Sequence, residues 1–329
     1  MVKGQVKRVA VLTSGGDAPG MNAAVRSFVR KALNSEYDVF GIYSGFRGLL
    51  DENIKQLDLR KVGQIINLGG TVLKTSRCEE FATTKGLKKA ANILNKNKIE
   101  ALCVIGGDGS FRGLLELAKY YTGQLIGVPG TIDNDIPGTE YTIGFDTAVN
   151  TAVVAVDKIR DTAASHGRIF FVEVMGRHSG QIALSVGLAC GAEDVLLPET
   201  KTDIDKLCQK IQNTKKQGKK FSIFIVAEGD DAGGAFKIAA SVKDKINLSA
   251  RVSVLGHIQR GGAPTAYERV WASRMGDAAV RFIKNGHNLV FTAMKGGNLV
   301  PAYLTEAVNG IRNVEPELVN LVRIAGGGS

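Results

Sequence analysis

The sequence predicts an α/β fold whose sheets are mainly parallel and covered by helices. Short apolar runs of strand length alternate with amphipathic segments of helix length along the chain, and this alternation is typical of strand–helix–strand units. Forty glycines against seven prolines are typical of tight turns between such elements. At 329 residues the chain exceeds the usual size of a single core, so we expect two domains.

The apolar runs mark the expected strands, and the segments between them mark the expected helices. Asp, Ser or Thr introduces several of these helices and can cap their exposed amide groups. We expect the long helix from Thr147 to make the first crossing between the domains. The expected strands are 8–12, 39–43, 101–105, 125–128, 169–174, 194–197, 221–227, 252–255 and 289–293. The expected helices are 21–34, 84–96, 111–120, 147–164, 180–190, 203–217 and 266–284.

The charge balance favours anionic partners such as phosphates, because Lys and Arg outnumber Asp and Glu by 42 to 32. The lysines gather in short runs at 85–98 and 215–220, which are typical of solvated helix faces. Only 6% of the residues are aromatic, so no stacking platform for nucleic acid stands out. Nucleic acid is therefore not an expected partner.

Cysteine usage and hydropathy indicate a cytoplasmic protein without a membrane partner. The four cysteines lie far apart and show no paired metal-ligand spacing, so we expect reduced thiols. No apolar stretch reaches the roughly 18 residues of a membrane span, and the first residues contain no signal-peptide core. The terminal residues 326–329, Gly-Gly-Gly-Ser, are typical of a flexible tail.

Two carboxylates, Asp133 and Asp135, follow the expected strand 125–128 in a short loop. In open parallel sheets, ligands bind outside the carboxyl ends of the strands, so we expect both side chains to project into a crevice and not into the core. Carboxylates this close repel each other unless a cation or a transferable proton separates them. An Asp/Asn-rich turn before Pro137 is the structural alternative.

Two glycine-rich turns, 14–22 and 105–110, follow expected strands and precede helices. Bare backbone amides at the start of a helix attract an anion. The first turn matches neither the Walker pattern nor the dinucleotide fingerprint. In the second turn, Asp108 is a suitable magnesium ligand, and Ser110 can cap the helix or donate to a phosphate oxygen. An Asx turn with a capping serine is the alternative there.

Basic side chains accompany glycines in three further loops, 69–78, 175–180 and 254–262. Arg77 in the first of them can clamp a phosphate with its planar guanidinium, although an ordinary surface arginine is the alternative. Repeated basic loops fit a substrate that carries its own phosphate.

In their order along the chain, these loops resemble those of the ATP-dependent 6-phosphofructokinase family of the bacterial type. The match includes Gly15-Gly16-Asp17 and the segments 106–110, 130–135, 175–177 and 256–262. The resemblance implies two Rossmann-like doubly wound domains and a homotetramer whose active sites are shared between subunits. It also implies an ATP-binding domain over 1–143 and 257–306, and a sugar-phosphate-binding domain over 144–256 and 307–325.

The resemblance assigns a set of ligand-binding residues on each side of the reaction. ATP would contact Gly16, Arg77, Cys78, Gly107, Asp108, Gly109 and Ser110, with Asp108 holding Mg²⁺. Fructose 6-phosphate would contact Thr131, Asp133, Met175, Gly176, Arg177, Glu228, His257 and Arg260. Arg168 and Arg251 would reach across a subunit interface and complete the sugar-phosphate site of the neighbouring subunit.

The implied activity is phosphorylation of fructose 6-phosphate at its 1-hydroxyl, giving fructose 1,6-bisphosphate and ADP in glycolysis. The implied catalytic residues are Asp133, Thr131, Asp135 and Arg177. Asp133 would act as general base, while magnesium and Arg77 neutralise charge on the transferred phosphoryl group. Arg177 would assist near the reacting centre, and Asp135 would shape the electrostatics around it.

An alternative is a regulatory homologue that binds these ligands without turnover. The presence of Asp108, Thr131, Asp133 and Arg177 together speaks against this alternative, because a homologue without turnover needs neither a base nor a metal carboxylate.

Two positions in the sequence indicate which phosphoryl donor the protein uses. Relatives that use pyrophosphate typically have Asp where this chain has Gly109 and Lys where it has Gly130. A carboxylate and an ammonium group there would crowd the α-phosphate of a nucleotide. The two glycines therefore favour ATP over pyrophosphate.

The family also binds ADP or phosphoenolpyruvate as effectors between subunits, and part of that basic cluster is present. The matching residues are Arg26, Arg30, Arg160, Glu193, Lys219 and Lys220. Asn53, Gln217 and Phe221 depart from the pattern, where an arginine, a lysine and a histidine are usual. Because each lost charge-assisted hydrogen bond costs about 1.5 to 3 kcal/mol, we expect a weak response to phosphoenolpyruvate. The retained arginines are equally compatible with an ordinary subunit interface.

Overall fold

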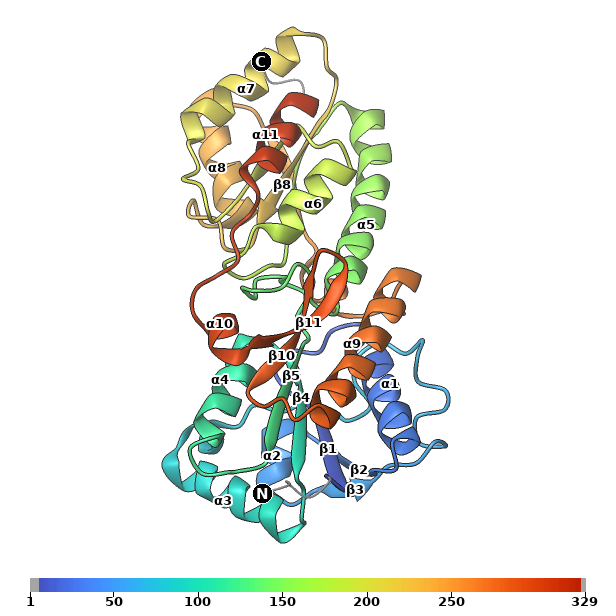
Figure 1. Ribbon diagram of the computed structural model, residues 1–329. Helices are drawn as coiled ribbons and strands as arrows, with labels where there is room; N and C mark the ends of the chain where they lie inside the picture. The colour runs from blue at the N-terminus through green and yellow to red at the C-terminus, as the bar shows by residue number, and fades with distance from the viewer. Residues whose placement is uncertain (1–5, 327–329) are drawn as a thin grey trace. The chain divides into compact units, whose positions relative to one another are not determined.

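The computed structural model describes residues 6–326, which form two compact α/β units (Figure 1). Within the described residues, unit 1 comprises 6–132, 136–147 and 260–311, and unit 2 comprises 133–135, 148–259 and 312–326. The predicted α/β fold with mainly parallel sheets is confirmed. The assignment of one domain to ATP and the other to the sugar phosphate stays a prediction.

Unit 1 contains a seven-stranded sheet in the order β11-β10-β5-β4-β1-β2-β3. The five inner strands are parallel, and the two edge strands, β11 and β3, pair antiparallel with their neighbours. The strands are β1 Arg8–Thr13, β2 Asp38–Ile42, β3 Ile54–Gln56, β4 Ala101–Gly106, β5 Gln124–Pro129, β10 Val290–Lys295 and β11 Asn298–Tyr303.

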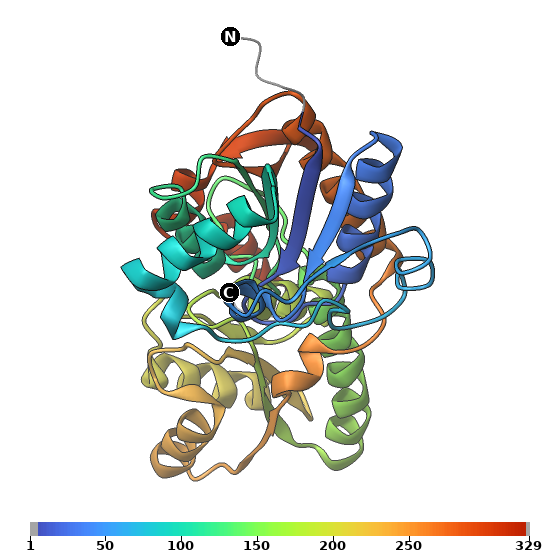
Figure 2. The same cartoon turned by 90° about the horizontal axis from the view of Figure 1, so that it is seen from below.

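Helices cover both faces of this sheet. Figures 1 and 2 show α1 and α9 side by side on one face, and α3 and α4 on the other. Phe111, Phe291 and Leu102 are fully buried in the core on the α3 and α4 side. The helices of unit 1 are α1 Met21–Asn34, α2 Gly45–Leu50, α3 Thr84–Lys96, α4 Asp108–Leu117, α9 Ala266–Lys284 and α10 Leu304–Val308, with a 3-10 turn η1 at Glu79–Ala82.

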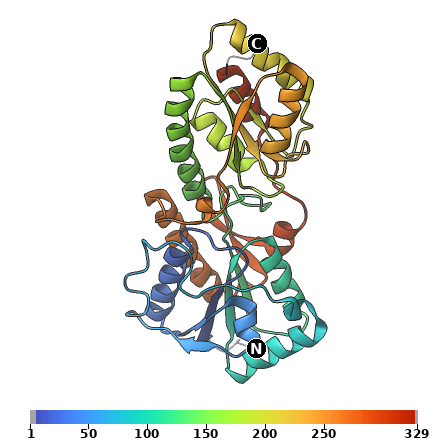
Figure 3. The same cartoon turned by 180° about the vertical axis from the view of Figure 1, so that it is seen from behind.

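Unit 2 contains a four-stranded, fully parallel sheet in the order β7-β8-β6-β9. Figures 1 and 3 show α7 and α8 on the face of the sheet opposite α5. Phe171 and Phe224 are fully buried between the sheet and the α7–α8 pair. The strands are β6 Ile169–Val174, β7 Asp194–Leu196, β8 Ser222–Ala227 and β9 Ala250–Val254. The helical elements are α5 Phe145–His166, α6 Gln181–Ala189, α7 Ile204–Lys216, α8 Gly234–Ile246, η2 Gly256–Arg260 and α11 Pro316–Ala325.

The structure adds elements that the apolar pattern did not predict. They are short, such as α2 and β3, or begin at residues that usually interrupt an element, such as Gly233-Gly234 before α8 and Pro316 at the start of α11. The helix expected at 111–120 begins three residues earlier, at Asp108. Of the predicted flexible tail 326–329, only Gly326 is described, and it caps α11; residues 327–329 lie outside the described residues.

The helices between residues 6 and 326 include none that is long and apolar enough to cross a membrane.

Candidate active site

Three neighbouring parallel strands of unit 1, β5, β4 and β1, end at the same edge of the sheet. The loops that follow them are bonded to one another through the main chain. The amide of Ser14 donates to the carbonyl of Ile105 at 2.9 Å, and the amide of Gly130 donates to the carbonyl of Gly106 at 3.0 Å. The two predicted glycine-rich turns and the loop that carries Asp133 therefore follow strand ends that are bonded to one another.

The loop after β4 leads directly into α4 with its first amide groups unclaimed by a capping side chain. Gly107 is the N-cap residue and makes no side-chain cap, and Asp108 is the first helical residue. Ser110 is 5% exposed and packs against Gly106, where a Cβ would come within 2.5 Å of the Ser110 hydroxyl. Gly109 is exposed, with open space around the position of a Cβ. The start of α4 therefore offers main-chain donors and a carboxylate to an anionic ligand with a metal.

The first glycine-rich loop is held by two other segments of unit 1. The Thr75 hydroxyl donates to the carbonyl of Gly15 at 2.8 Å, which fixes the loop 69–78 beside it. An Arg260 guanidinium nitrogen donates to the carbonyl of Asp17 at 3.2 Å, and the guanidinium occupies the space that a side chain at Gly16 would need. Gly16 and Arg260 were assigned to ATP and to the sugar, respectively, and here they are in contact.

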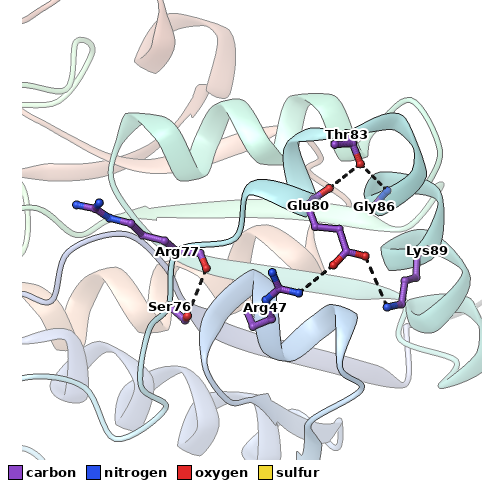
Figure 4. Close-up of polar contacts among 7 residues, drawn as sticks. All are labelled: Arg47, Ser76, Arg77, Glu80, Thr83, Gly86 and Lys89. Carbon is purple, nitrogen blue, oxygen red and sulfur yellow. Dashed lines mark hydrogen bonds and ion pairs between the residues drawn. The ribbon is translucent and has the colours of Figure 1, made fainter.

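Arg77 lies in the loop 69–78. Its exposed side chain extends away from a nearby group of ion pairs (Figure 4). In that group, Glu80 pairs with Arg47 at 2.9 Å and with Lys89 at 3.8 Å. Cys78, next to Arg77, is a half-buried free thiol. The guanidinium of Arg77 thus takes no part in the ion pairs of Glu80, which is compatible with a phosphate contact.

Asp108 is the one carboxylate that the sequence predicts as a metal ligand. Asp108 lies 3.3 Å from Arg112 through its Oδ2 atom, and both side chains are partly exposed. The described part of the chain contains no cluster of three or more His, Cys, Asp or Glu suited to a metal. One carboxylate nevertheless fits Mg²⁺, which protein sites commonly hold through one or two carboxylates, water and substrate phosphates.

The loop after β5 divides between the two units. Thr131 is half-buried in unit 1, where its carbonyl accepts a hydrogen bond from the Thr142 hydroxyl at 2.7 Å. Asp133, Asn134 and Asp135 belong to unit 2. Asp133 is only 2% exposed, so the expectation that it projects into an open crevice is not met; Asp135 is half-buried. A second loop of unit 2 contacts this tripeptide, because the Ser179 hydroxyl donates to the carbonyl of Asp133 at 3.1 Å.

That second loop follows β6 and carries three predicted sugar contacts, Met175, Gly176 and Arg177. Gly176 has φ 148°, and a Cβ there would collide with the carbonyl of Ser179. Arg177 adopts the left-handed conformation with φ 54°, which is unfavourable for a residue with a long side chain. Its side chain is exposed. Such a backbone persists only where neighbouring groups hold it.

Two side chains hold the backbone of this turn from neighbouring elements. The amide of Arg177 donates to Glu228 Oε1 at 2.7 Å, just past the end of β8. The amide of Met175 donates to Gln259 Oε1 at 2.9 Å, and Gln259 is fully buried. Glu228 was predicted as a sugar contact, and the structure shows that one of its oxygens orients the turn. Gln259 was not predicted, because an amide side chain inside a glycine-rich loop carries no specific signal.

The other predicted sugar contacts are exposed side chains. Arg168 precedes β6, and Arg251 lies on β9, where it is paired with Phe170 of β6. His257 lies in η2. All three belong to unit 2, whereas Arg260 belongs to unit 1.

The candidate effector residues are divided between the units. Arg26 and Arg30 lie on α1 in unit 1, whereas Arg160, Glu193, Lys219 and Lys220 lie in unit 2. Glu193 is 2% exposed and is already engaged, because it pairs with Lys219 at 2.9 Å and accepts from the amide of Ile223 at 3.1 Å. Arg160 donates to the carbonyl of Cys190.

A buried carboxylate near the start of α5 was missed by the sequence reasoning. Glu268 is fully buried and accepts from the Tyr141 hydroxyl at 2.8 Å and from the amide and hydroxyl of Thr147 at 3.2 Å each. Burial raises the pKa of Glu268 to about 7, although these donors oppose the shift. The pattern Thr265-x-x-Glu268 is a capping-box signal, and Thr265 does cap α9; that signal could have marked the residue.

Comparison with known proteins gives one consistent family. The family profile described as Phosphofructokinase matches residues 8–283. An ATP-dependent 6-phosphofructokinase of Bacillus velezensis is 50% identical over 316 residues, covering 96% of this chain and 98% of the relative. ATP-dependent 6-phosphofructokinase 1 of Thermus thermophilus is 49% identical over 319 residues, covering 97% of this chain and 99% of the relative.

Solved structures agree with this result. Phosphofructokinase from Saccharomyces cerevisiae superimposes with a TM-score of 0.86 at 35% identity over 92% of this chain, and the chain spans 45% of that longer yeast chain. A pyrophosphate-dependent phosphofructokinase from Marinobacter aquaeolei has the same fold, with a TM-score of 0.82 at 21% identity. Since the profile covers most of the chain and the relatives cover nearly all of it, this chain belongs to the phosphofructokinase family.

Proposed function

We propose that this chain is an ATP-dependent 6-phosphofructokinase, which transfers the γ-phosphoryl group of ATP to the 1-hydroxyl of fructose 6-phosphate. The products are fructose 1,6-bisphosphate and ADP, and the reaction belongs to glycolysis. The relatives that support this activity are about half identical to the chain over nearly its whole length and carry that name.

The observation that carries the donor side of the proposal is the start of α4. Gly107 at its N-cap offers no capping side chain, Gly109 is exposed, and Asp108 is a partly exposed carboxylate between them. The amides bind phosphate oxygens, and Asp108 holds Mg²⁺. When bound, Mg²⁺ neutralises charge on the β- and γ-phosphates. Arg77 and Gly16 complete the contacts with ATP.

The surroundings of two glycines support ATP as the donor. Gly109 is surrounded by open space, which leaves room for a nucleotide beside the start of α4. Gly130 is tightly packed, because a Cβ there would come within 3.0 Å of Ile105 and Met21. A lysine at that position would therefore require the core to rearrange.

The sugar side of the site is the turn after β6 in unit 2. Arg177 binds the sugar phosphate or the reacting oxygens through its exposed guanidinium, and Met175 and Gly176 form the wall beside it. Glu228 accepts a hydrogen bond from a sugar hydroxyl through its second carboxylate oxygen, because the first already accepts from the Arg177 amide. His257 and Arg260 add polar contacts. Arg168 and Arg251 serve the neighbouring subunit in a homotetramer.

Asp133 removes the proton from the 1-hydroxyl, while Thr131 and Asp135 shape the environment of the transferred group. A general base must come within about 2.6 to 3.2 Å of the proton's oxygen, and Asp133 is 2% exposed here. In the proposed function, the carboxylate of Asp133 must therefore become accessible to the sugar, while its main-chain carbonyl keeps the bond to Ser179.

We place the enzyme in the cytoplasm and expect little response to ADP or phosphoenolpyruvate, because Glu193 is already paired and Asn53, Gln217 and Phe221 offer no cation.

Coupled detection of ADP release tests the activity. The purified protein with Mg-ATP should release ADP only when fructose 6-phosphate is present, and pyrophosphate should not replace ATP. Asp133→Ser should lower kcat by about 10²- to 10⁴-fold, the usual contribution of a general base, with little change in sugar affinity. Near-normal turnover of this variant would refute the assignment of the base, and sugar-independent ADP release would refute the acceptor.

A further inference from the structure

The tripeptide that contains the proposed base is held by unit 2, although the residues on both sides of it belong to unit 1. The Ser179 hydroxyl donates to the carbonyl of Asp133 at 3.1 Å. The amide of Arg312 donates to the carbonyl of Asp135 at 2.9 Å. Both ends of the tripeptide are therefore bonded to unit 2 through main-chain carbonyls.

Ser179 is built into the same turn that carries Arg177. Its amide donates to the carbonyl of Gly176 at 2.9 Å, which closes the turn, and its side chain is fully buried. The following residue is fixed as well, because the amide of Gly180 donates to Glu199 Oε1 at 2.8 Å. The hydroxyl thus links this turn to the base loop by one side-chain hydrogen bond.

From these contacts, we propose that Ser179 is a positioning residue that sets the location of Asp133 relative to the sugar-binding turn 175–179. The inference rests on the proposed function, in which Asp133 is the base and Arg177 contacts the sugar. It adds that both groups are fixed to one another inside unit 2 by a serine hydroxyl. Between the two bonded carbonyls, Asn134 adopts the left-handed conformation with φ 49°, which asparagine tolerates and which turns the chain there.

Removing the hydroxyl should weaken catalysis more than binding. A displacement of about 1 Å at a catalytic group can lower the rate about 100-fold. Ser179→Ala keeps the volume of the buried site, so we expect kcat to fall about 10- to 100-fold and the KM for fructose 6-phosphate to change less than about threefold. Turnover is expressed per ATP-binding site, counted by equilibrium dialysis without sugar, so that loss of folded protein does not lower the value.

A double-mutant cycle separates positioning of the base from a general structural effect. In the Asp133→Ser background, Ser179→Ala should cause less than a twofold further loss of kcat. An equal loss in both backgrounds, or an unchanged kcat of Ser179→Ala alone, overturns the proposal. Near-normal kcat of Asp133→Ser alone refutes the proposed base instead, and so the two failures are distinguishable.

Thr214→Val is the matched control, because it removes another buried hydroxyl of unit 2, which donates to the carbonyl of Lys210 at 2.8 Å on α7. It should leave kcat within twofold of the parent. If Ser179→Ala does not fold, the kcat of Ser179→Cys tests the proposal instead, since a thiol is a weak donor of similar size. A severalfold loss of kcat is expected for it, and parental kcat would overturn the proposal.

Discussion

The loop after β4 in unit 1 and the loop after β6 in unit 2 both connect a parallel strand to a helix, yet they are held differently. The loop after β4 leaves the amides at the start of α4 without a side-chain cap. In the loop after β6, side chains take those groups: Glu199 accepts from Gly180, and the Ser179 hydroxyl accepts from the amide of Gln181 at 3.4 Å.

This difference indicates how each loop can bind an anion. A helix start with available amides can bind phosphate through the main chain. At the start of α6 the amide of Gly180 is already satisfied by the Glu199 carboxylate, so in the proposed function the exposed Arg177 side chain supplies the positive charge. The contrast fits the proposal that one loop binds a triphosphate through its main chain and the other binds a sugar phosphate through side chains.

The largest expected effect comes from a charge at the open loop. Gly109→Asp should raise the KM for ATP about 100-fold, because a carboxylate beside the triphosphate costs several kcal/mol at short range. The fold should be unaffected, since the Cβ meets open space and an acidic residue suits a helix start. Steady-state kinetics measure the KM for ATP, and a thermal melt measures the stability of the fold. Gly109→Asn is the uncharged control, and an equal effect of both variants would argue against electrostatic repulsion.

A smaller effect is expected where a side chain holds the sugar turn. Glu228→Gln should raise the KM for fructose 6-phosphate about tenfold, because the Arg177 amide loses a charged acceptor worth about 1.5 kcal/mol or more. The KM for ATP should not change. Glu173→Gln is the control, since Glu173 also accepts from a main-chain amide of unit 2, that of Ala235 at 2.8 Å. If Glu173→Gln raises the KM for fructose 6-phosphate as much as Glu228→Gln does, the rise is not specific to the turn.

The smallest effect concerns stability and involves one glycine from each loop. Gly180→Ala should lower the free energy of unfolding by about 1 kcal/mol, because the Cβ would lie 2.7 Å from Leu197 and 2.6 Å from Glu199. Gly109→Ala should leave it unchanged or raise it slightly, since alanine favours a helix. Urea denaturation of both variants measures the difference. Equal stabilities would show that the loops are packed alike.

Helices with a clear apolar period were predictable from the sequence. The expected helices 21–34, 84–96 and 266–284 match α1, α3 and α9 residue for residue, because periodicity and flanking polar residues are local signals. The start of α4 was placed three residues late, since the helix begins at Asp108 within glycines that weaken the local signal. The glycine-rich and basic loops were also recognisable, because their residue types are themselves the chemistry of phosphate binding.

The sequence alone determined the fold class, the longer apolar strands and the clearly periodic helices and, through the loops, the family of the chain. Only the tertiary structure decided which polar side chains hold those loops. Ser179, Gln259 and Glu199 act on residues far from them in the sequence, or through main-chain atoms that have no residue-specific signature. Tertiary structure also decided that Asp133 is buried, because burial depends on which loop packs over it, and local sequence does not encode that contact.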